Sequence, residues 1–184
     1  METALLVIDM QHFFLSMCNA SLGNITALIE HFKAHKLPCI LTQHGHSQAE
    51  LAASPPTSQL VRRWGASGSI AVDSDDWQLI PQIAAHVDEH TPVVGKNTYD
   101  AFINTDLDSL LREQRVQRVV VCGVMTDCCC DTTARSAFCR GFETWLVEDA
   151  CGSASKEQHS AGLKGFAFAF GDVIKTKEVL EKIK

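Results

Sequence analysis

The sequence predicts an α/β fold in which a mostly parallel sheet carries helices on both faces. Short apolar, largely β-branched runs alternate along the chain with segments of helical spacing, which is the pattern of successive βαβ units. The runs are continuously apolar, as strands buried on both faces are. Several of them end at a polar or charged residue, and ligands of such sheets bind beyond the carboxyl ends of the strands.

Length and composition predict one domain over residues 1–184 and exclude several classes of protein. The chain is 46% apolar and 21% charged, which is ordinary for a globular domain with a full core. A net charge of −6 without a basic cluster argues against nucleic-acid binding. The apolar runs are too short to span a bilayer, and no signal peptide is evident. The eight cysteines are then interpreted as reduced thiols of a cytoplasmic protein.

Six short segments have the composition of strands. The first, residues 4–9, is apolar and ends at Asp9, and the second, residues 38–42, leads into a loop with His44 and His46. A brief third strand precedes Lys96. The predicted strands after the second lie at residues 92–95, 118–122, 142–147 and 173–174.

Helices are predicted between these strands from apolar spacing and end signals. Residues 24–36 have apolar residues at helical spacing and end in cations, which suits the helix dipole. Thr105 resembles an N-cap, and Ser155 with Gln158 resembles a capping box. Gly141 is placed to end a helix. The other predicted helices are residues 105–114, 126–140, one from 155 and 176–183, with a short helix or turn at 77–83.

Residues 47–75 are predicted to be an irregular loop because they contain prolines, glycines and many small polar residues. A loop of this length inside a compact domain is usually a lid or a pocket wall. Trp64 is a large apolar residue within it. It is interpreted as an anchor of the loop to the core, with a place in a pocket wall as the alternative.

Cys128, Cys129 and Cys130 follow an apolar strand and a break at Gly123, in the first turn of a predicted helix. Backbone N–H groups and the helix dipole favour thiolate over thiol there. Adjacent residues on a helix point about 100° apart, so at most two of these thiols can face one pocket. Adjacent thiols also make a poor metal site, and no C-x-x-C pair is present. A redox role and simple burial as small apolar residues remain alternatives.

Asp9 and Lys96 are candidates to act with one of these thiols. Both follow apolar strands, so both are expected at the same sheet edge as the cysteines. Asp9 can accept the thiol proton if its pKa is suitable, and Lys96 can hold carboxylate and thiolate together. A thiol nucleophile attacks a carbonyl or nitrile carbon, and backbone N–H groups stabilise the charge that develops. The pattern therefore predicts hydrolysis of a C–N bond in a small amide.

Three motifs resemble the isochorismatase-like cysteine hydrolases, which include nicotinamidases, N-carbamoylsarcosine amidohydrolases and ureidoacrylate hydrolases. They are Asp9-Met10-Gln11-x-x-Phe14, Lys96 followed by Tyr99-Asp100-Ala101-Phe102, and Gly123-Val124-Met125-Thr126-Asp127-x-Cys129 with Thr133-Ala134. The resemblance covers about residues 4–175. It implies a Rossmann-like, three-layer fold with a six-stranded sheet.

The resemblance also implies site residues. Asp9 is then the general base, Lys96 the electrostatic partner and Cys129 the nucleophile. A cis peptide is implied at Val124–Met125, with the backbone N–H groups of Met125 and Cys129 as oxyanion donors. Substrate contacts are predicted for Gln11, Phe14, Trp64 and Tyr99.

The resemblance says less about metal binding and about the reaction than about the site residues. Nicotinamidases carry Thr-Gln-Asp-x-His after the second strand and bind zinc or iron, whereas this chain has Thr42-Gln43-His44-Gly45-His46. His44 and His46 can chelate a metal, but no third ligand follows nearby. The main prediction is a metal-independent cysteine hydrolase of a small amide, ureide or carbamoyl compound, without a cofactor. A metal-containing nicotinamidase and a non-catalytic binding protein are the alternatives, and relatives suggest a homodimer or homotetramer.

Overall fold

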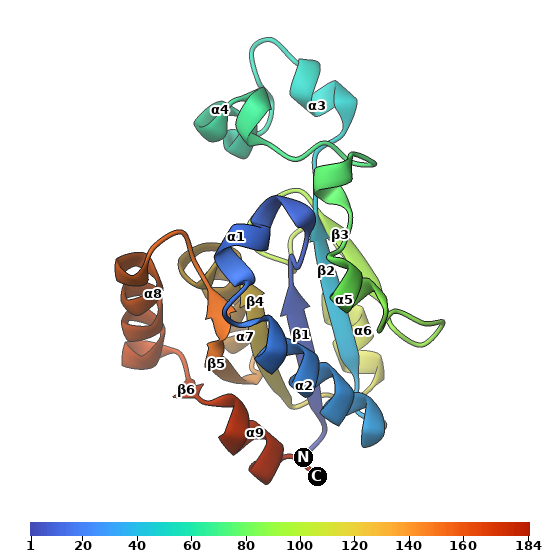
Figure 1. The fold of residues 1–184 in the computed structure, drawn as a ribbon, viewed down its shortest axis with the longest axis vertical. Helices are drawn as coiled ribbons and strands as arrows, with labels where there is room; N and C mark the ends of the chain where they lie inside the picture. The colour runs from blue at the N-terminus through green and yellow to red at the C-terminus, as the bar shows by residue number, and fades with distance from the viewer.

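The computed structural model describes residues 1–184 and contains a six-stranded, all-parallel sheet with helices on both faces (Figure 1). The strand order is β3-β2-β1-β4-β5-β6, so the order reverses between β1 and β4. This confirms the predicted fold class. The strands are β1 (Thr3–Ile8), β2 (Cys39–His44), β3 (Val93–Lys96), β4 (Arg118–Val124), β5 (Glu143–Gly152) and β6 (Asp172–Ile174).

The two faces of the sheet bury separate apolar clusters. In β1, Leu5 and Val7 pack toward one face, with α2 and α9, while Leu6 and Ile8 pack toward the other, with α6 to α8. The α-helices are α1 (Leu15–Cys18), α2 (Leu22–Ala34), α3 (Gln48–Ala52), α4 (Gln59–Trp64), α5 (Pro81–Ala84), α6 (Leu107–Glu113), α7 (Asp131–Cys139), α8 (Lys156–Ala169) and α9 (Thr176–Lys182). None of them is both long and apolar enough to cross a membrane.

Residues 47–75 differ from the irregular loop that was predicted. They contain α3, α4 and a 3₁₀ turn, η2 (Ala66–Gly68), and Figure 1 shows this segment standing off from the sheet beyond the carboxyl end of β2. Ser47 and Glu50 form a reciprocal capping box on α3, and Ser58 caps α4. Helices this short contain too few turns to produce a readable apolar period, so their caps were the only signal.

Two further boundaries were predicted wrongly. The fifth strand continues to Gly152, because pairing with β4 resumes after an irregularity between Val121 and Gly123. The N-cap residue of α6 is Asp106, one position after the predicted Thr105, although the Thr105 hydroxyl accepts the Leu107 N–H at 3.3 Å while it donates to the Ala101 carbonyl at 2.5 Å. Ser155 does cap α8, accepting the Gln158 N–H.

We expect Gly123→Ala to destabilise the fold strongly. Gly123 has φ 115°, and a Cβ there would lie 2.2 Å from the Ile8 carbonyl oxygen of the neighbouring strand β1. The clash is with backbone at the centre of the sheet, so relaxation would have to separate β1 from β4. A loss of at least about 3 kcal/mol in the free energy of unfolding is expected. Urea denaturation measures it. Gly23→Ala in α2, where a Cβ meets no atom within 4 Å, is the control and should be neutral or stabilising.

Candidate active site

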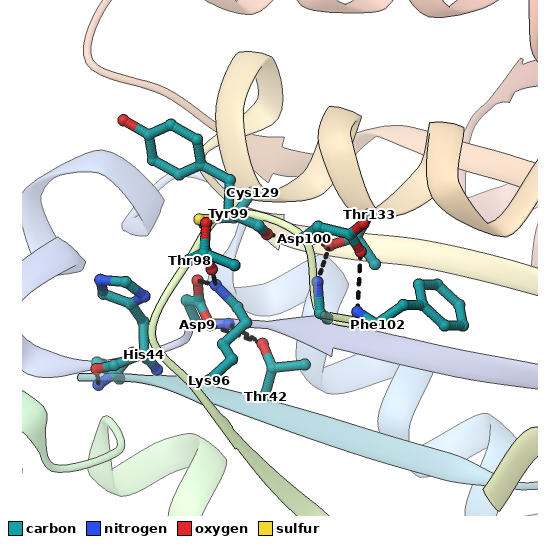
Figure 2. Close-up of polar contacts among 12 residues, drawn as sticks. Asp9, Thr42, His44, Lys96, Thr98, Tyr99, Asp100, Phe102, Cys129 and Thr133 are labelled. Atoms are coloured by element: carbon teal, nitrogen blue, oxygen red, sulfur yellow. Dashed lines mark hydrogen bonds and ion pairs between the residues drawn. The ribbon is translucent and has the colours of Figure 1, made fainter. Parts of the chain in front are cut away.

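Asp9, Lys96 and Cys129 meet at the carboxyl edge of the sheet, where the strand order reverses (Figure 2). Asp9 follows β1, Lys96 ends β3 and Cys129 lies in the turn after β4. Lys96 Nζ is 2.6 Å from Asp9 Oδ2 and donates to Cys129 Sγ at 3.4 Å. All three side chains are buried. The structure thus brings together the three residues that were predicted to act as a unit.

Thr42 on the neighbouring strand β2 holds the Asp9 carboxylate in place. The Thr42 hydroxyl donates to Asp9 Oδ1 at 2.6 Å and accepts the Asp9 backbone N–H at 3.1 Å. Asp9 has φ 49°, a left-handed conformation that turns the chain sharply at the end of β1. Oδ1 is therefore held by Thr42, whereas Oδ2 faces the Lys96 ammonium that also contacts Cys129.

The Lys96 ammonium group makes three polar contacts. Besides Asp9 and Cys129, Nζ donates to the Thr98 carbonyl at 2.9 Å. An ammonium has three protons, so all its donors are engaged and the group is fixed in direction. The loop after Lys96 is tied to α7 by the Thr133 hydroxyl, which accepts the Ala101 N–H and donates to the Tyr99 carbonyl.

Burial and mutual charge set the protonation of the three groups. Burial raises the pKa of the Asp9 carboxyl, but the Lys96 ammonium and His44 outweigh it, so this pKa lies below its usual value. Burial lowers the pKa of Lys96, and Asp9 and Cys129 raise it above its usual value. Burial raises the pKa of the Cys129 thiol; Lys96 opposes this rise and Asp9 adds to it. These shifts favour a carboxylate on Asp9, an ammonium on Lys96 and a neutral thiol on Cys129, whereas the helix-start pattern predicts a thiolate.

The turn that carries the cysteines is not the regular helix start that was predicted. Residues Thr126–Cys130 form a π-helical turn, η4, and α7 begins only at Asp131. The N–H groups of Cys128 and Cys130 both donate to the Met125 carbonyl at 3.1 Å. The preceding Val124–Met125 peptide is cis. Cys130 is buried and does not line the cavity, and Cys128 is half-buried at its wall. Of the three thiols, Cys129 is the one that contacts Lys96.

The end of β5, the residue after it and α8 contact the η4 turn. The Thr126 hydroxyl donates to the Gly152 carbonyl at 3.0 Å and lies 2.8 Å from His159 Nδ1. Ser153 donates to the Asp127 carboxylate. Gly162 of α8 allows close approach, since a Cβ there would lie 2.9 Å from Asp127 Cα. Sequence reasoning missed these partners because they come from later segments of the chain, around the end of β5 and in α8, and carry no motif.

A cavity of about 320 Å³ opens beside Cys129. Of the predicted contact residues, Phe14, Trp64 and Tyr99 line it. Trp64 is 52% exposed and its indole N–H donates to the Tyr99 hydroxyl at 2.9 Å, so it is part of the wall and not a core anchor. The complete lining is Phe13, Phe14, Met17, His44, His46, Leu60, Trp64, Gly68, Ser69, Ile70, Tyr99, Met125, Cys128, Cys129, Ala154 and Gln158.

Gln11 does not line the cavity, which corrects its predicted role in substrate contact. Its side chain is fully buried. The amide donates to the carbonyls of His44 and Trp77, at 2.9 and 2.8 Å, and its oxygen accepts the His44 N–H at 2.8 Å. These bonds fasten the segment around Trp77 to the end of β2. Gln11 therefore supports the edge of the site from within the protein.

His44 and His46 form a buried pair at the cavity wall. Their rings are 5.1 Å apart in an edge-to-face arrangement, and His46 Nδ1 lies 3.7 Å from Glu50 Oε1. Burial lowers the pKa of His44 to about 4, with Lys96 adding to the effect, so this ring is neutral near pH 7. No group of three or more His, Cys, Asp or Glu side chains is arranged to hold a metal ion.

Comparisons with known proteins agree on one family. A model of the isochorismatase domain matches residues 3–178. Nicotinamidase 3 of Arabidopsis thaliana is 37% identical over 172 residues, covering 93% of this chain and 83% of that protein. The crystal structure of a cysteine hydrolase from Pseudomonas syringae is similar with a TM-score of 0.87 and 26% identity, covering 98% and 91% of the two chains. N-carbamoylsarcosine amidase from Thermoplasma acidophilum is similar with a TM-score of 0.81 and 25% identity, covering 95% and 96%.

Proposed function

This chain belongs to the isochorismatase family of hydrolases, and we propose that it is a cysteine hydrolase that cleaves a C–N bond of a small amide, ureide or carbamoyl compound. One observation carries the proposal. Lys96 Nζ contacts both the Asp9 carboxylate and the Cys129 thiol, at 2.6 and 3.4 Å, next to a cavity large enough for a small molecule. A buried thiol, a base and a fixed cation are the groups that acyl transfer to sulfur needs.

In the first half of the proposed reaction, Cys129 becomes acylated. Asp9 Oδ2 takes the thiol proton as Sγ attacks the substrate carbonyl carbon. Lys96 remains charged throughout, so it stabilises whichever of the two neighbours carries the negative charge. Met125 and Cys129 supply backbone N–H groups for the oxyanion. Asp9 then returns its proton to the departing nitrogen, and the C–N bond breaks to leave a thioester.

In the second half, water hydrolyses the thioester. Asp9, again a carboxylate, takes a proton from water as the oxygen attacks the thioester carbonyl. The C–S bond breaks, the thiolate regains a proton from Asp9, and a carboxylic acid leaves. The low pKa of Asp9 keeps it ionised and ready at neutral pH. Activity is then expected to persist to mildly acidic pH and to be lost as pH falls through that lowered pKa.

Mass spectrometry tests the proposal directly. We would incubate the protein with a panel of small amides, ureides and carbamoyl compounds, measure ammonia or amine release, and quench in acid during turnover. The expected result is an acyl adduct on the Cys129 peptide, at the mass of the substrate minus its leaving amine. The mechanism would be contradicted if the intact protein turned over a substrate without forming an adduct and Cys129→Ala kept the same activity. Absence of turnover with intact protein would favour the non-catalytic alternative.

A nicotinamidase is the second candidate, favoured by the similarity to the Arabidopsis nicotinamidase. Ammonia release from nicotinamide tests the activity. Elemental analysis of the same protein sample tests whether a metal accompanies it. A bound metal in stoichiometric amount, lost in His46→Ala together with activity, would favour the metal-containing form over the metal-independent one.

We expect His159 to position the oxyanion donors. Thr126 has one hydroxyl proton and donates it to the Gly152 carbonyl, so the bond at 2.8 Å requires a proton on His159 Nδ1. His159→Ala removes this donor and loosens η4, which should lower kcat about tenfold with little change in KM. His159→Asn, whose amide N–H can replace Nδ1–H, should restore most of it. His159→Gln, which places its amide nearer Nε2, should not.

Steady-state kinetics and melting temperatures of these variants check the prediction. A fall in melting temperature with kcat unchanged would assign His159 a structural role only. Equal kcat for the Asn and Gln variants would also contradict the assigned proton on Nδ1.

A further inference from the structure

The cavity beside Cys129 has mostly apolar and aromatic walls. Its Phe, Tyr and Trp side chains come from three segments: Phe13 and Phe14 follow β1, Trp64 ends the outlying helix α4, and Tyr99 follows β3. Met17, Leu60, Ile70 and Met125 complete an apolar surround. None of the lining residues is Lys, Arg, Asp or Glu.

The two ionised groups next to Cys129 compensate each other. Asp9 and Lys96 form a buried pair at 2.6 Å, both side chains are 0% exposed, and neither lines the cavity. A substrate charge would therefore meet a neutral pair and not a free counter-ion. His44, at the wall, adds no charge near neutral pH because burial lowers its pKa to about 4.

Two features near the cavity could attract an anion, and both are offset. The Arg63 guanidinium lies 5.5 Å from the Trp64 ring centroid, but Arg63 is exposed and outside the lining, so water and salt screen its charge. The first turn of α8 contributes Gln158 to the wall. That turn is capped by the Ser155 hydroxyl, which accepts the Gln158 N–H, and it also contains Glu157.

We propose that this cavity takes uncharged substrates with a flat or branched apolar body and rejects those that carry a carboxylate or an ammonium group. An apolar body gains from leaving water, whereas an ion would lose its hydration without meeting a Lys, Arg, Asp or Glu counter-ion in the lining. The proposal rests on the proposed function, since it concerns the acyl part of the amide that Cys129 would attack. It separates two chemistries found among the relatives: nicotinamide is uncharged, whereas N-carbamoylsarcosine carries a carboxylate.

The test uses aromatic amides that are matched in shape and differ in charge. The probes are 3-acetylbenzamide, its anionic isostere 3-carboxybenzamide, and the cationic 3-(aminomethyl)benzamide. We expect kcat/KM to be at least about 100-fold higher for the neutral amide than for either ion. Equal or better use of 3-carboxybenzamide would overturn the proposal.

Binding to the Cys129→Ala protein keeps this test separate from the reaction. Calorimetry with the same three amides should rank the neutral compound first. If that ranking holds but the intact protein hydrolyses none of them, the charge selectivity stands and the proposed hydrolysis of such amides fails. If the anion binds as tightly as the neutral compound, the selectivity fails whether or not turnover occurs.

A charge placed in the wall should change the preference. Leu60 on α4 lines the cavity, so Leu60→Lys should shift the ratio of kcat/KM for 3-carboxybenzamide over 3-acetylbenzamide upward by at least about tenfold. Leu60→Met is the matched neutral control, and Arg63→Gln should leave the ratio within about twofold. If Arg63→Gln instead lowered the ratio of kcat/KM for 3-carboxybenzamide over 3-acetylbenzamide strongly, Arg63 would be a carboxylate-binding residue. That result would overturn the proposal.

Discussion

Cys129→Ala is expected to abolish turnover of any amide that the protein hydrolyses, by at least about 10⁴-fold in kcat. No neighbouring group can replace it. Cys128 is half-buried at the cavity wall, and the Lys96 ammonium donates to Cys129 Sγ and not to this thiol. Lys96 and Asp9 are aligned on Cys129 alone, so a displaced thiol would have neither its base nor its cation.

Cys128→Ala is the matched control and should retain kcat within about threefold. Both variants remove one thiol from the same turn, and only one removes the contact with Lys96 at 3.4 Å. Initial rates and melting temperatures of the two proteins decide the question. Comparable losses in both variants would mean that the turn, and not the Cys129 thiol, carries the activity.

Lys96→Met is expected to destabilise the protein by about 3–5 kcal/mol at neutral pH, because it leaves the Asp9 carboxylate buried without its cation. The ion pair is buried, with both side chains 0% exposed, so water cannot replace the missing ammonium. Asp9→Asn with Lys96→Met should recover part of this loss, since the double variant contains no unpaired buried charge. Urea denaturation of the single and double variants measures both effects.

The free energy of unfolding should depend on pH differently in the wild type and in Lys96→Met. In the wild type the pKa of Asp9 is lowered, so its contribution to stability is present above the usual carboxyl pKa and is lost as pH falls through the folded value. The pKa of Lys96 is raised, so its contribution is present below the usual ammonium pKa and is lost only as pH rises through the folded value. The pair should therefore contribute a constant stability between roughly pH 5 and 9.

In Lys96→Met, burial acts on Asp9 without the opposing ammonium, so the pKa of Asp9 is expected to rise above its usual value even though the Thr42 hydrogen bond remains. Stability should then fall as pH rises through that raised pKa, since ionising Asp9 is costlier in the folded state. Denaturation at pH 5 and pH 8 checks this. A variant whose loss of stability is the same at both values would contradict the assigned role of Lys96 in neutralising Asp9.

Local sequence determined the strands and the principal helices, and with them the edge at which the site forms. Apolar β-branched runs such as residues 118–124 can be buried on both faces only as inner strands, and parallel strands bring their carboxyl ends together. Asp9, Lys96 and Cys129 therefore had to approach one another once each was seen to follow such a run. The choice of Cys129 over its neighbours came from motif resemblance, because adjacent thiols look alike in a sequence.

Tertiary structure alone decided the environment of these groups. The pKa of the Cys129 thiol is raised because packing buries it and sets Asp9 beside it, which a helix-start pattern cannot show. Gln11 holds the end of β2 in place because its amide donates to backbone carbonyls of two distant segments, at His44 and Trp77. His159 reaches Thr126 across 33 residues, and the apolar wall joins residues from α4 to residues after β1. Such contacts depend on long-range packing, and neither propensity nor periodicity encodes it.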